Sequence, residues 1–390
     1  MAGLGWLLIN VIVAIFAYVI MPDNTENANF QIIELTKQAP GARYTLILEP
    51  NKVQKEARGI FNSLLNGRPD QFRPIPVSDR ASLQIKGDSL HYIDTRNHPQ
   101  HLLLPELMLP IDPFAPDAVK WKASNRKAYD LRGDQIFYVN RSGKKTEASL
   151  KALEQRFWDE NVKEGKFWLG SDAYGRDQLS RLLLGTRVSL GIGLMAVLVS
   201  LLLGVTLGAL AGFFRGKVDQ VIMWFVSVVW SIPTLLLAIS LAFVLGKGTW
   251  QLFLAIGVSS WVDVARIVRG QFFSLREMQF VEATKAMGFK WPRAIGRHIL
   301  PNILSPLIIV AAANFATAIL MEAGLSFLGV GIQPPVPSWG GMIKEGYTQI
   351  MFDSGAWLAI FPGLAIILVV ISLNLVGFGL RDALDPKQEQ

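Results

Sequence analysis

Long uncharged, mostly apolar runs alternate with charged segments along this chain, and their lengths predict membrane-spanning helices. A helix needs about 20 such residues to cross the roughly 30 Å hydrocarbon core of a bilayer, because each residue rises about 1.5 Å. Met1–Pro22 is the first run without charge, and several later runs are as long or longer. The pattern predicts six spans, at about 3–21, 188–213, 220–246, 249–270, 303–327 and 356–380.

The first run reads as a retained helix and not as a cleaved signal peptide. No lysine or arginine precedes it, and no small-x-small cleavage site stands ahead of Asp23. The predicted first span therefore occupies residues 1–22 as an anchor.

Charge in the short loops predicts the orientation of these spans. Segment Asp263–His298 contains seven basic and three acidic residues. Short basic loops stay in the cytoplasm, whereas long segments translocate whatever their charge. Counting spans back from this loop places both termini in the cytoplasm and residues 23–187 outside.

Residues 23–165 differ in kind from the spans and predict an α+β unit inserted between the first and second. Two segments resemble each other, Ile85–Asp94 (IKGDSLHYID) and Leu131–Asn140 (LRGDQIFYVN). Gly-Asp suits a turn and the alternation after it suits a half-buried strand, so we expect paired β-hairpins. Further predicted pieces are a strand at 44–48, a proline-rich loop at 104–116 and a helix at 151–157.

Composition narrows the possible functions. The chain is 51% hydrophobic and 18% charged, with a net charge of +7, which on so apolar a chain favours membrane loops over a nucleic-acid partner. It contains no cysteine, which excludes disulfides, thiol nucleophiles and thiolate metal sites. His91, His98 and His101 have spacing that a metal site could use, but surface histidines are the favoured reading.

The cytoplasmic segment between the fourth and fifth spans predicts two helices joined by a tight turn. Ser274 and Glu277 have capping-box spacing for a helix that stops at Gly288. A second helix starts near Pro292, and Pro301 ends it before the next span. Such a pair could lie on lipid headgroups or could carry a displacement from a soluble motor to the membrane helices. The residues alone leave both readings open.

A resemblance to a known family separates these readings. Glu282-Ala283-Thr284, Gly288 and Ile299-Leu300-Pro301 resemble the EAA loop of ABC importer permeases, with Thr284 standing where a second alanine is commonest. Other stretches resemble the dipeptide/oligopeptide permeases of the C-subunit type. They are Trp168–Arg187, Glu322–Gly341 and Phe361–Lys387. The outer insert is longer than this family leads us to expect.

The resemblance implies a type I ABC importer permease fold over residues 166–387, in the bacterial inner membrane. It implies that loop 274–302 docks into a cleft of a cytoplasmic ATPase. Glu282 and Ala283 would lie in the docking helix and Gly288 at its turn. The other implied coupling residues are Arg293 and Arg297, facing acidic ATPase surface, and Pro301 at the end of the motif.

The chain has no Walker A sequence, so ATP must be bound by partner subunits, and no cofactor or ATPase site is expected here. The resemblance implies four kinds of partner: a second homologous permease, two ATPase subunits, an extracytoplasmic binding protein and membrane lipid. It also implies an outer motif near the gate, with residues Asp172, Gly175, Arg176, Asp177 and Glu322.

Several of these side chains have simpler structural readings. Asp172, Arg176 and Asp177 can pair with one another in an outer turn. Glu322 reads as an interfacial carboxylate bonded to the glycine-rich turn after it, since it lies near the outer end of its helix. Asp263 has helical spacing to pair with Arg266 and Arg269.

Two features of the spans concern packing. Gly204, Gly208 and Gly212 recur every four residues and predict a close helix contact, either within this subunit or against a partner. Pro233 predicts a kink in the third span.

Short peptides are the substrate that the resemblance favours, with nickel or another small solute as the alternative. A rival class is a membrane-anchored sensor whose outer unit binds a ligand, although the chain has no cytoplasmic signalling domain. A membrane enzyme is weaker still, because no catalytic constellation stands within the spans.

Overall fold

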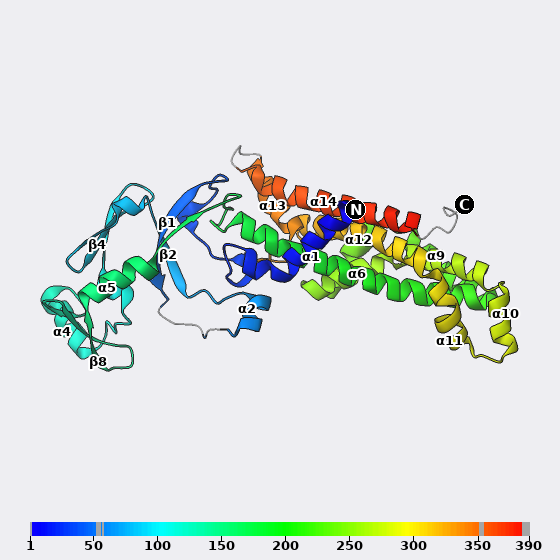
Figure 1. Ribbon diagram of the computed structural model, residues 1–390, viewed down its shortest axis with the longest axis horizontal. Helices are drawn as coiled ribbons and strands as arrows, with labels where there is room; N and C mark the ends of the chain where they lie inside the picture. The colour runs from blue at the N-terminus through cyan, green and yellow to red at the C-terminus, as the bar shows by residue number, and fades with distance from the viewer. Residues whose placement is uncertain (1, 52–55, 57, 351–354, 384–390) are drawn as a thin grey trace. The chain divides into compact units, whose positions relative to one another are not determined.

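The computed structural model describes residues 2–51, 56, 58–350 and 355–383 (Figure 1). The chain divides into two compact units. One consists of Met1–Met21 with Arg181–Gln390, and the other is Pro22–Ser180. The first is called the membrane unit and the second the outer unit below.

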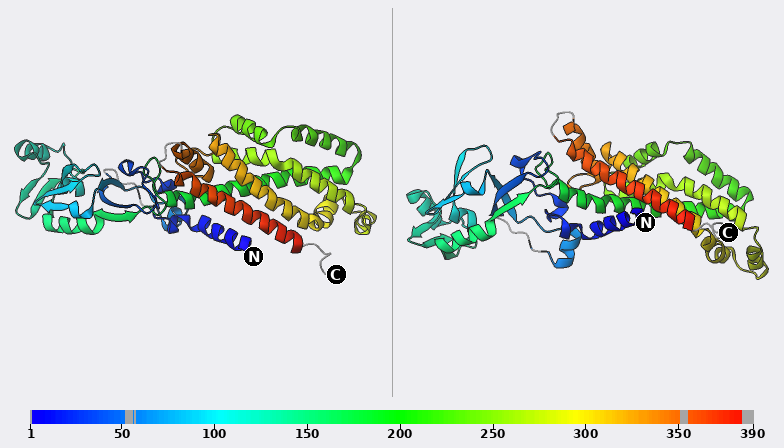
Figure 2. Two further views of the ribbon diagram at one scale, coloured as in Figure 1. Left: turned by 90° about the horizontal axis from the view of Figure 1, so that it is seen from above. Right: turned by 45° about the horizontal axis from the view of Figure 1, so that its top comes forward.

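The membrane unit is a bundle of long apolar helices, which run side by side in both views of Figure 2. Five described helices are long and apolar enough to cross a membrane, or up to six if one bent pair counts as a span. The helices are α1 (Ala2–Ile20), α6 (Gln178–Phe214), α7 (Gly216–Trp230), α8 (Thr234–Leu245), α9 (Thr249–Leu275), α12 (Leu304–Phe327), α13 (Trp339–Ile350) and α14 (Trp357–Ala383). Helix α14 packs against α1, α12 and α13.

The predicted third span, 220–246, is a broken helix. Helices α7 and α8 meet at an angle of 90°. The predicted bend at Pro233 is confirmed, and here it breaks the helix completely. Proline has this effect because it lacks an amide hydrogen and clashes with the preceding turn. The Pro233 carbonyl accepts the amide of Leu237 at 3.0 Å, so Pro233 sits at the start of α8.

The glycine repeat of α6 brings this helix against the backbone of α9, as predicted. A Cβ on Gly204 would lie 2.8 Å from the carbonyl oxygen of Trp261, and one on Gly208 would lie 2.5 Å from that of Ala265. Side chains at these positions would therefore push the two helices apart. Only hydrogen leaves room for backbones at this separation.

The outer unit contains three small antiparallel sheets, each with three strands among the described residues. The first places β1 (Arg43–Pro50) between β2 (Phe72–Val77) and β9 (Val162–Lys166). The second orders β3 (Gln84–Lys86), β4 (Ser89–Ile93) and β5 (Pro99–Leu103), and the third orders β6 (Asp130–Arg132), β7 (Gln135–Val139) and β8 (Lys145–Ser149). The helices of this unit are α2 (Ile60–Asn66), α3 (Leu104–Met108), α4 (Pro116–Asn125) and α5 (Leu150–Arg156), and a π-type turn follows at Phe157–Asn161. The predicted strand at 44–48 and helix at 151–157 are confirmed.

The second and third sheets are a tandem structural repeat that includes more than the predicted hairpins. Each hairpin turns at a glycine with positive φ, 61° at Gly87 and 63° at Gly133. In each repeat the carbonyl of the following aspartate accepts the first amide of the helix after the sheet. These bonds join Asp88 to Leu104 at 2.9 Å and Asp134 to Leu150 at 2.8 Å.

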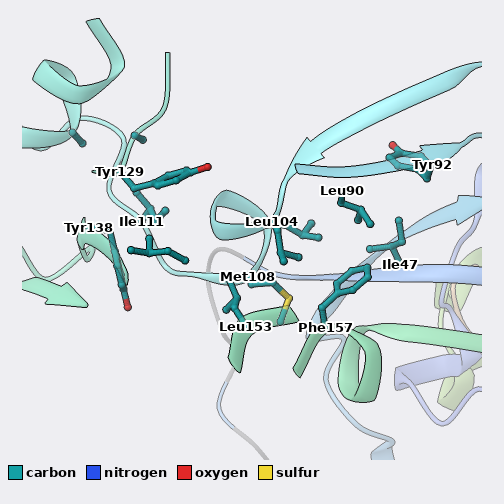
Figure 3. Close-up of a cluster of buried hydrophobic side chains, with 14 of the residues drawn as sticks. Ile47, Leu90, Tyr92, Leu104, Met108, Ile111, Tyr129, Tyr138, Leu153 and Phe157 are labelled. Carbon is teal, nitrogen blue, oxygen red and sulfur yellow. The ribbon is translucent and has the colours of Figure 1, made fainter. Parts of the chain in front are cut away.

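The prediction of a proline-rich loop at 104–116 is wrong for its first part, where α3 forms. Pro105 stands at the start of this helix, where its missing amide hydrogen costs nothing. Leu104 and Met108 then point into the largest core of the outer unit, together with Ile47, Leu90 and Phe157 (Figure 3).

The three histidines lie exposed on the second sheet. His91 and His101 face each other across β4 and β5 with ring centroids 6.2 Å apart, and His98 lies 3.7 Å from Asp94. Among the residues that the structure describes, no group of three histidine, aspartate or glutamate side chains could hold a metal ion.

The α6–α9 contact predicts that Gly208→Ala destabilises the protein, because the new methyl group meets a main-chain oxygen that cannot move alone. We expect a loss of about 1–3 kcal/mol in the free energy of unfolding, the usual cost of overpacking. Gly191→Ala in the same helix is the matched control, since nothing lies within 4 Å of its Cβ position. Denaturant unfolding in detergent micelles measures both, and an equal stability of the two variants would contradict the packing described.

Candidate functional site

The segment between α9 and α12 forms an elbow that protrudes from the ends of α6 and α9. Helix α10 (Gln279–Ala286) leads into a short helix α11 (Trp291–Arg293). A π-type turn at Ala294–Ile299 and a 3₁₀ turn at Leu300–Ile303 then continue into α12. The elbow is thus a helix, a tight turn and a second helical segment, as the sequence predicts.

Two details of the predicted elbow are wrong. The capping box does not form, because α9 continues through Ser274 to Leu275 and the next helix begins only at Gln279. Pro301 does not end the second helical segment either. It occupies the first turn of the 3₁₀ segment, where a missing amide hydrogen is tolerated, and the helix runs on into α12.

One face of α10 is buried in the membrane unit. Val281 is fully buried in a cluster that also contains Phe272, Ile299 and Ile303. Thr284 is buried one turn later, and its hydroxyl donates to the carbonyl of Val281 at 2.7 Å. This threonine satisfies its own polar group locally, so it fits a position where alanine is commonest in the resembling family.

The opposite face of α10 is exposed. Glu282 and Ala283 lie on it, and two large apolar side chains, Phe280 and Met287, are exposed at its edge. Spacing alone could have found the last two, because residues 280, 283 and 287 recur at i, i+3 and i+7 and so form one strip along the helix, beside the strip of 281 and 284. An exposed apolar face on a surface helix is a feature of protein contact sites.

Gly288 ends α10 in the left-handed conformation, with φ of 73°. The amide of Phe289 donates to the carbonyl of Thr284 at 3.1 Å, the long bond of a Schellman cap. The predicted role of Gly288 in terminating the helix is therefore supported by its geometry.

Polar and aromatic contacts fasten the elbow to the end of α6. The guanidinium of Arg276 donates to the carbonyl of Phe213, and Arg215 pairs with Glu277 at 2.8 Å. Trp291 packs edge-on against Phe214 with centroids 5.5 Å apart. These braces join residues 62 to 77 positions apart, so no local pattern could have predicted them.

The remaining coupling candidates lie on the outside of the second helical segment. Arg293, Arg297 and Pro301 are all exposed. Arg293 stacks over the ring of Phe289 at 4.4 Å, and the same ring stacks on His298 at 5.6 Å. The segment therefore presents positive charge on an ordered surface.

The predicted ion pair of Asp263 is wrong. Arg269 instead pairs with Asp219 at 2.5 Å, and Arg266 stacks over the ring of Trp230 at 4.4 Å. Both arginines reach toward α7 and away from their own helix. Asp263 is exposed on α9.

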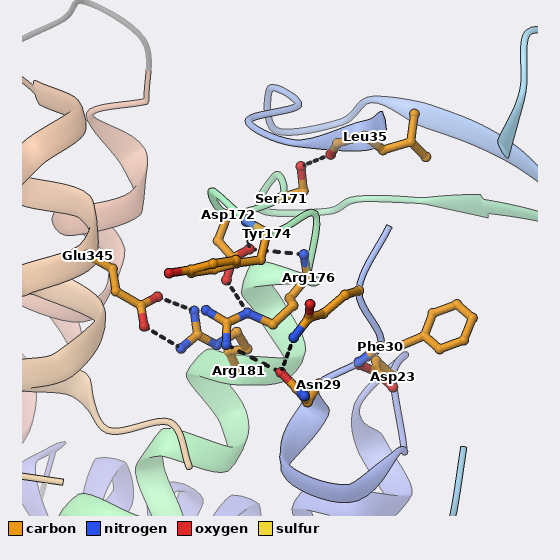
Figure 4. Close-up of polar contacts among 11 residues, drawn as sticks. Asp23, Asn29, Phe30, Leu35, Ser171, Asp172, Tyr174, Arg176, Arg181 and Glu345 are labelled. Atoms are coloured by element: carbon orange, nitrogen blue, oxygen red, sulfur yellow. Dashed lines mark hydrogen bonds and ion pairs between the residues drawn. The ribbon is translucent and has the colours of Figure 1, made fainter. Parts of the chain in front are cut away.

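The outer motif folds as a tight, buried loop within the outer unit (Figure 4). One carboxylate oxygen of Asp172 accepts the amides of Tyr174 and Arg176 at 2.8 and 3.0 Å. The other accepts the Nε of Arg176 at 2.6 Å, and both side chains are 3% exposed. The predicted local pairing is confirmed for Asp172 and Arg176.

Asp177 does something different from its neighbours. Its carboxylate accepts the amide and hydroxyl of Ser180, at 2.7 and 2.5 Å, and so caps the first turn of α6. Burial raises the pKa of this carboxyl, against the effect of the serine hydrogen bonds. Gly175, with φ of 72°, lets the loop pass so close to Ile32 that a Cβ would lie 1.8 Å from its carbonyl oxygen.

The loop belongs with the outer unit because it is hydrogen-bonded back to it. Ser171 donates to the carbonyl of Leu35 at 2.5 Å and accepts the amide of Gln38 at 2.9 Å. Hydropathy predicts the boundary near 165, whereas the compact outer unit extends to Ser180.

Glu322 is fully buried within the protein, and its predicted link to the glycine-rich turn runs through a serine. It accepts hydrogen bonds from Ser189 of α6 at 3.1 Å and from Ser326 at 2.8 Å. Ser326 in turn accepts the amide of Ile332 at 3.3 Å. The carboxylate therefore ties α12 to α6 and, through Ser326, holds the glycine-rich loop that follows.

A second ion pair, buried on its arginine side only, was not predicted from sequence. Arg181, which is 3% exposed, forms a two-pronged contact with Glu345 of α13, at 2.6 and 3.2 Å (Figure 4). The two residues stand 164 positions apart, and α13 is not among the described helices that are long and apolar enough to cross a membrane. No pattern in the sequence of α6 or α13 would have revealed this pair.

The buried Asp172–Arg176 pair predicts that Asp172→Asn costs about 3–5 kcal/mol in the free energy of unfolding, because a buried cation then faces a neutral amide. Glu160→Gln is the matched control. It removes an i,i+4 ion pair, Arg156–Glu160 at 2.7 Å, that is more than half exposed and should contribute less than about 1 kcal/mol. Denaturant titration of the purified variants compares them. Similar losses for the two would show that the buried pair is no stronger than a surface one.

The sequence is similar to those of known transport proteins. The family model described as the binding-protein-dependent transport system inner membrane component matches residues 204–390. A glutathione transport system permease protein, GsiD of Pectobacterium atrosepticum, is 42% identical over 220 residues, 56% of this chain and 72% of that protein. A dipeptide transport system permease protein, DppC of Alkalihalophilus pseudofirmus, is 42% identical over 222 residues, 57% of this chain and 72% of that protein. A solved structure of the MetNI methionine ABC transporter, in an inward-facing conformation, covers 53% of this chain and 97% of its own at 18% identity, with a TM-score of 0.44. This chain belongs to the family of inner membrane components of binding-protein-dependent transport systems, as a permease of the ABC importer type.

Proposed function

We propose that the chain forms half of the translocation pathway of an ATP-driven importer of short peptides, and that α10 is the part gripped by an ATPase. The observation that carries the proposal is the two-sided construction of α10. Val281 and Thr284 anchor it in the membrane unit, while Ala283 points away from them and is exposed, as are Phe280 and Met287 beside the buried strip. The exposed residues of such a helix can bind an ATPase, and its buried residues can transmit a displacement to the membrane unit.

The braces of the elbow support its mechanical role. Coupling between distant sites needs a physically continuous element with defined arrangements. Arg276 and Arg215 join the elbow to the end of α6, and Phe272 joins it to α9. A push on α10 therefore moves both helices together, whereas a flexible loop would absorb it.

In the proposed cycle, each of two ATPase subunits holds the elbow of one permease, this chain or a homologous partner. ATP binding draws the ATPases together and the permeases open toward the binding protein. ATP hydrolysis then separates the ATPases and returns the permeases to their starting conformation. Arg293 and Arg297 would face acidic ATPase surface, Glu282 would lie at the rim of the docking contact, and Pro301 would fix the direction in which the elbow joins α12.

The orientation belongs to the same proposal. ATPase subunits are cytoplasmic, so the elbow lies inside and the outer unit outside, in agreement with the excess of basic residues in Asp263–His298. The outer motif formed by Asp172, Gly175, Arg176 and Asp177 would then stiffen the start of α6 on the outer face, and Glu322 would hold the loop after α12.

Short peptides are the proposed cargo because the relatives' names point to closely related chemistry. One relative is named for glutathione, itself a short peptide, and another for dipeptides. Uptake of a labelled dipeptide into vesicles that contain the assembled importer and its binding protein tests this directly. Uptake of a small inorganic solute such as nickel, with no competition from di- and tripeptides, would contradict the peptide assignment and leave the coupling proposal standing.

The docking role of α10 predicts that Ala283→Trp releases the ATPase without unfolding the permease. A bulky ring on the exposed face blocks close approach of a partner, so we expect at least about tenfold less ATPase in pull-downs, while stability changes by no more than about 0.5 kcal/mol. Ala123→Trp, on the exposed side of α4 in the outer unit, is the matched control and should retain the ATPase. Equal recovery of ATPase with both variants would remove α10 from the contact.

A further inference from the structure

We propose that helix α2 of the outer unit is an interfacial membrane anchor, whose apolar face lies in the headgroup region of the lipid bilayer. The helix reads IFNSLLN and separates its residues cleanly by type. At 100° per residue, positions 60, 61, 64 and 65 share one side and positions 62, 63 and 66 share the other. The first set is apolar and the second polar.

The apolar side of α2 is open to its surroundings. Ile60 is 82% exposed and Phe61 is 84% exposed, and no residue of the helix is buried. The polar side is occupied locally, since Asn66 donates to Asn62 at 2.6 Å and Ser63 to the carbonyl of Arg58 at 3.2 Å. The helix therefore presents a large aromatic and an aliphatic side chain outward, which water alone would not favour.

Hydrogen bonds and an ion pair restrict where this helix can lie. The residues that follow α2 are hydrogen-bonded to the segment that follows α1. The amide of Arg68 donates to the carbonyl of Asn24 at 2.9 Å, and the amide of Glu26 donates to the carbonyl of Arg68 at 3.1 Å. Arg58, just ahead of α2, pairs with Glu26 at 2.7 Å. Both ends of α2 are thus tied to residues 24–26.

Those residues follow the end of α1 almost at once. Helix α1 ends at Ile20, and the four residues from there to Asn24 can span no more than about 14 Å. The interfacial layer on each side of a bilayer is about 5–8 Å deep, and interfacial helices bury their apolar face about 5–10 Å into it. The membrane surface is therefore within reach of α2, and this holds whichever side the outer unit occupies.

Lipid is the occupant that this geometry favours over a protein partner. The tether from α1 to residues 24–26 is short, and Arg68 beside the helix adds positive charge that would attract anionic headgroups, whereas Arg58 is already paired with Glu26. Such an anchor would restrain the outer unit near the membrane, in addition to its covalent links through α1 and α6.

The absence of cysteine from the chain permits a clean test with single labels. Phe61→Cys and Asn62→Cys are adjacent and both exposed, but the first lies on the apolar side of α2 and the second on the polar side. Each full-length variant is labelled with an environment-sensitive fluorophore and reconstituted into vesicles of phosphatidylcholine and phosphatidylglycerol. Lipids with a nitroxide near the headgroup quench from the membrane, and iodide quenches from water.

The expected result is several-fold stronger quenching by the nitroxide lipid at position 61 than at position 62, with iodide giving the reverse order. Strong iodide quenching at both positions would mean that α2 is solvated and would overturn the anchor. Protection of position 61 from both quenchers would indicate a protein contact and would also overturn it. These readouts need no ATPase, so they are independent of the proposed coupling role of α10.

A second measurement guards against loss of folding. Ile60→Ser with Phe61→Ser removes the apolar face at exposed positions, so the variant should retain its stability in detergent. A label at Leu65→Cys, on the apolar side, should then become more accessible to iodide, because the helix no longer rests on lipid. An unchanged accessibility would contradict the anchor.

Discussion

The close approach of α6 and α9 is the constraint on which the membrane unit depends. Glycines at 204, 208 and 212 place the α6 backbone against carbonyl groups of α9, and Gly212 lies against the Cβ of Phe272. That phenylalanine is fully buried in the cluster that receives α10. Membrane helices gain little from apolar burial alone, because lipid is equally apolar, so intimate backbone packing supplies the stability. The contact between α6 and α9 therefore makes the cluster against which the elbow packs rigid.

Polar contacts inside the protein then determine how the connecting segments are held. Glu322 joins α6 to the loop after α12, and Arg181 joins α6 to α13. Arg276 and Arg215 do the same for the elbow at the other end of α6. Helix α6 is therefore the element to which these connections attach. A displacement of the elbow would be transmitted along α6 to the loop after α12 and to α13.

The outer unit is stabilised differently, without disulfides. Its core is built from two copies of a strand–strand–strand–helix unit, and a buried aspartate at 88 accepts bonds from Tyr129 and Lys127, both at 2.5 Å. These bonds link the first copy to the segment leading into the second. Its loop at 171–177 is fixed by an ion pair that is almost completely buried. In a chain without cysteine, packing and satisfied polar groups must supply the rigidity that crosslinks supply elsewhere.

Features that depend on neighbours along the chain could be predicted from the amino-acid sequence. Uncharged runs indicated the spans, since hydrocarbon admits no unpaired charge, and glycine spacing identified the close helix face. Gly288 and the Gly-Asp turns could be recognised because positive φ demands particular residues. The partners that distant residues take became known from the folded structure alone. Asp219 displaced Asp263 as the partner of Arg269, Glu322 was buried by serines from two helices, and Arg181 found Glu345 across 164 positions. The physical reason is that a charge in a low-dielectric interior must be paired wherever the fold brings a partner, and sequence spacing reports only neighbours along one helix.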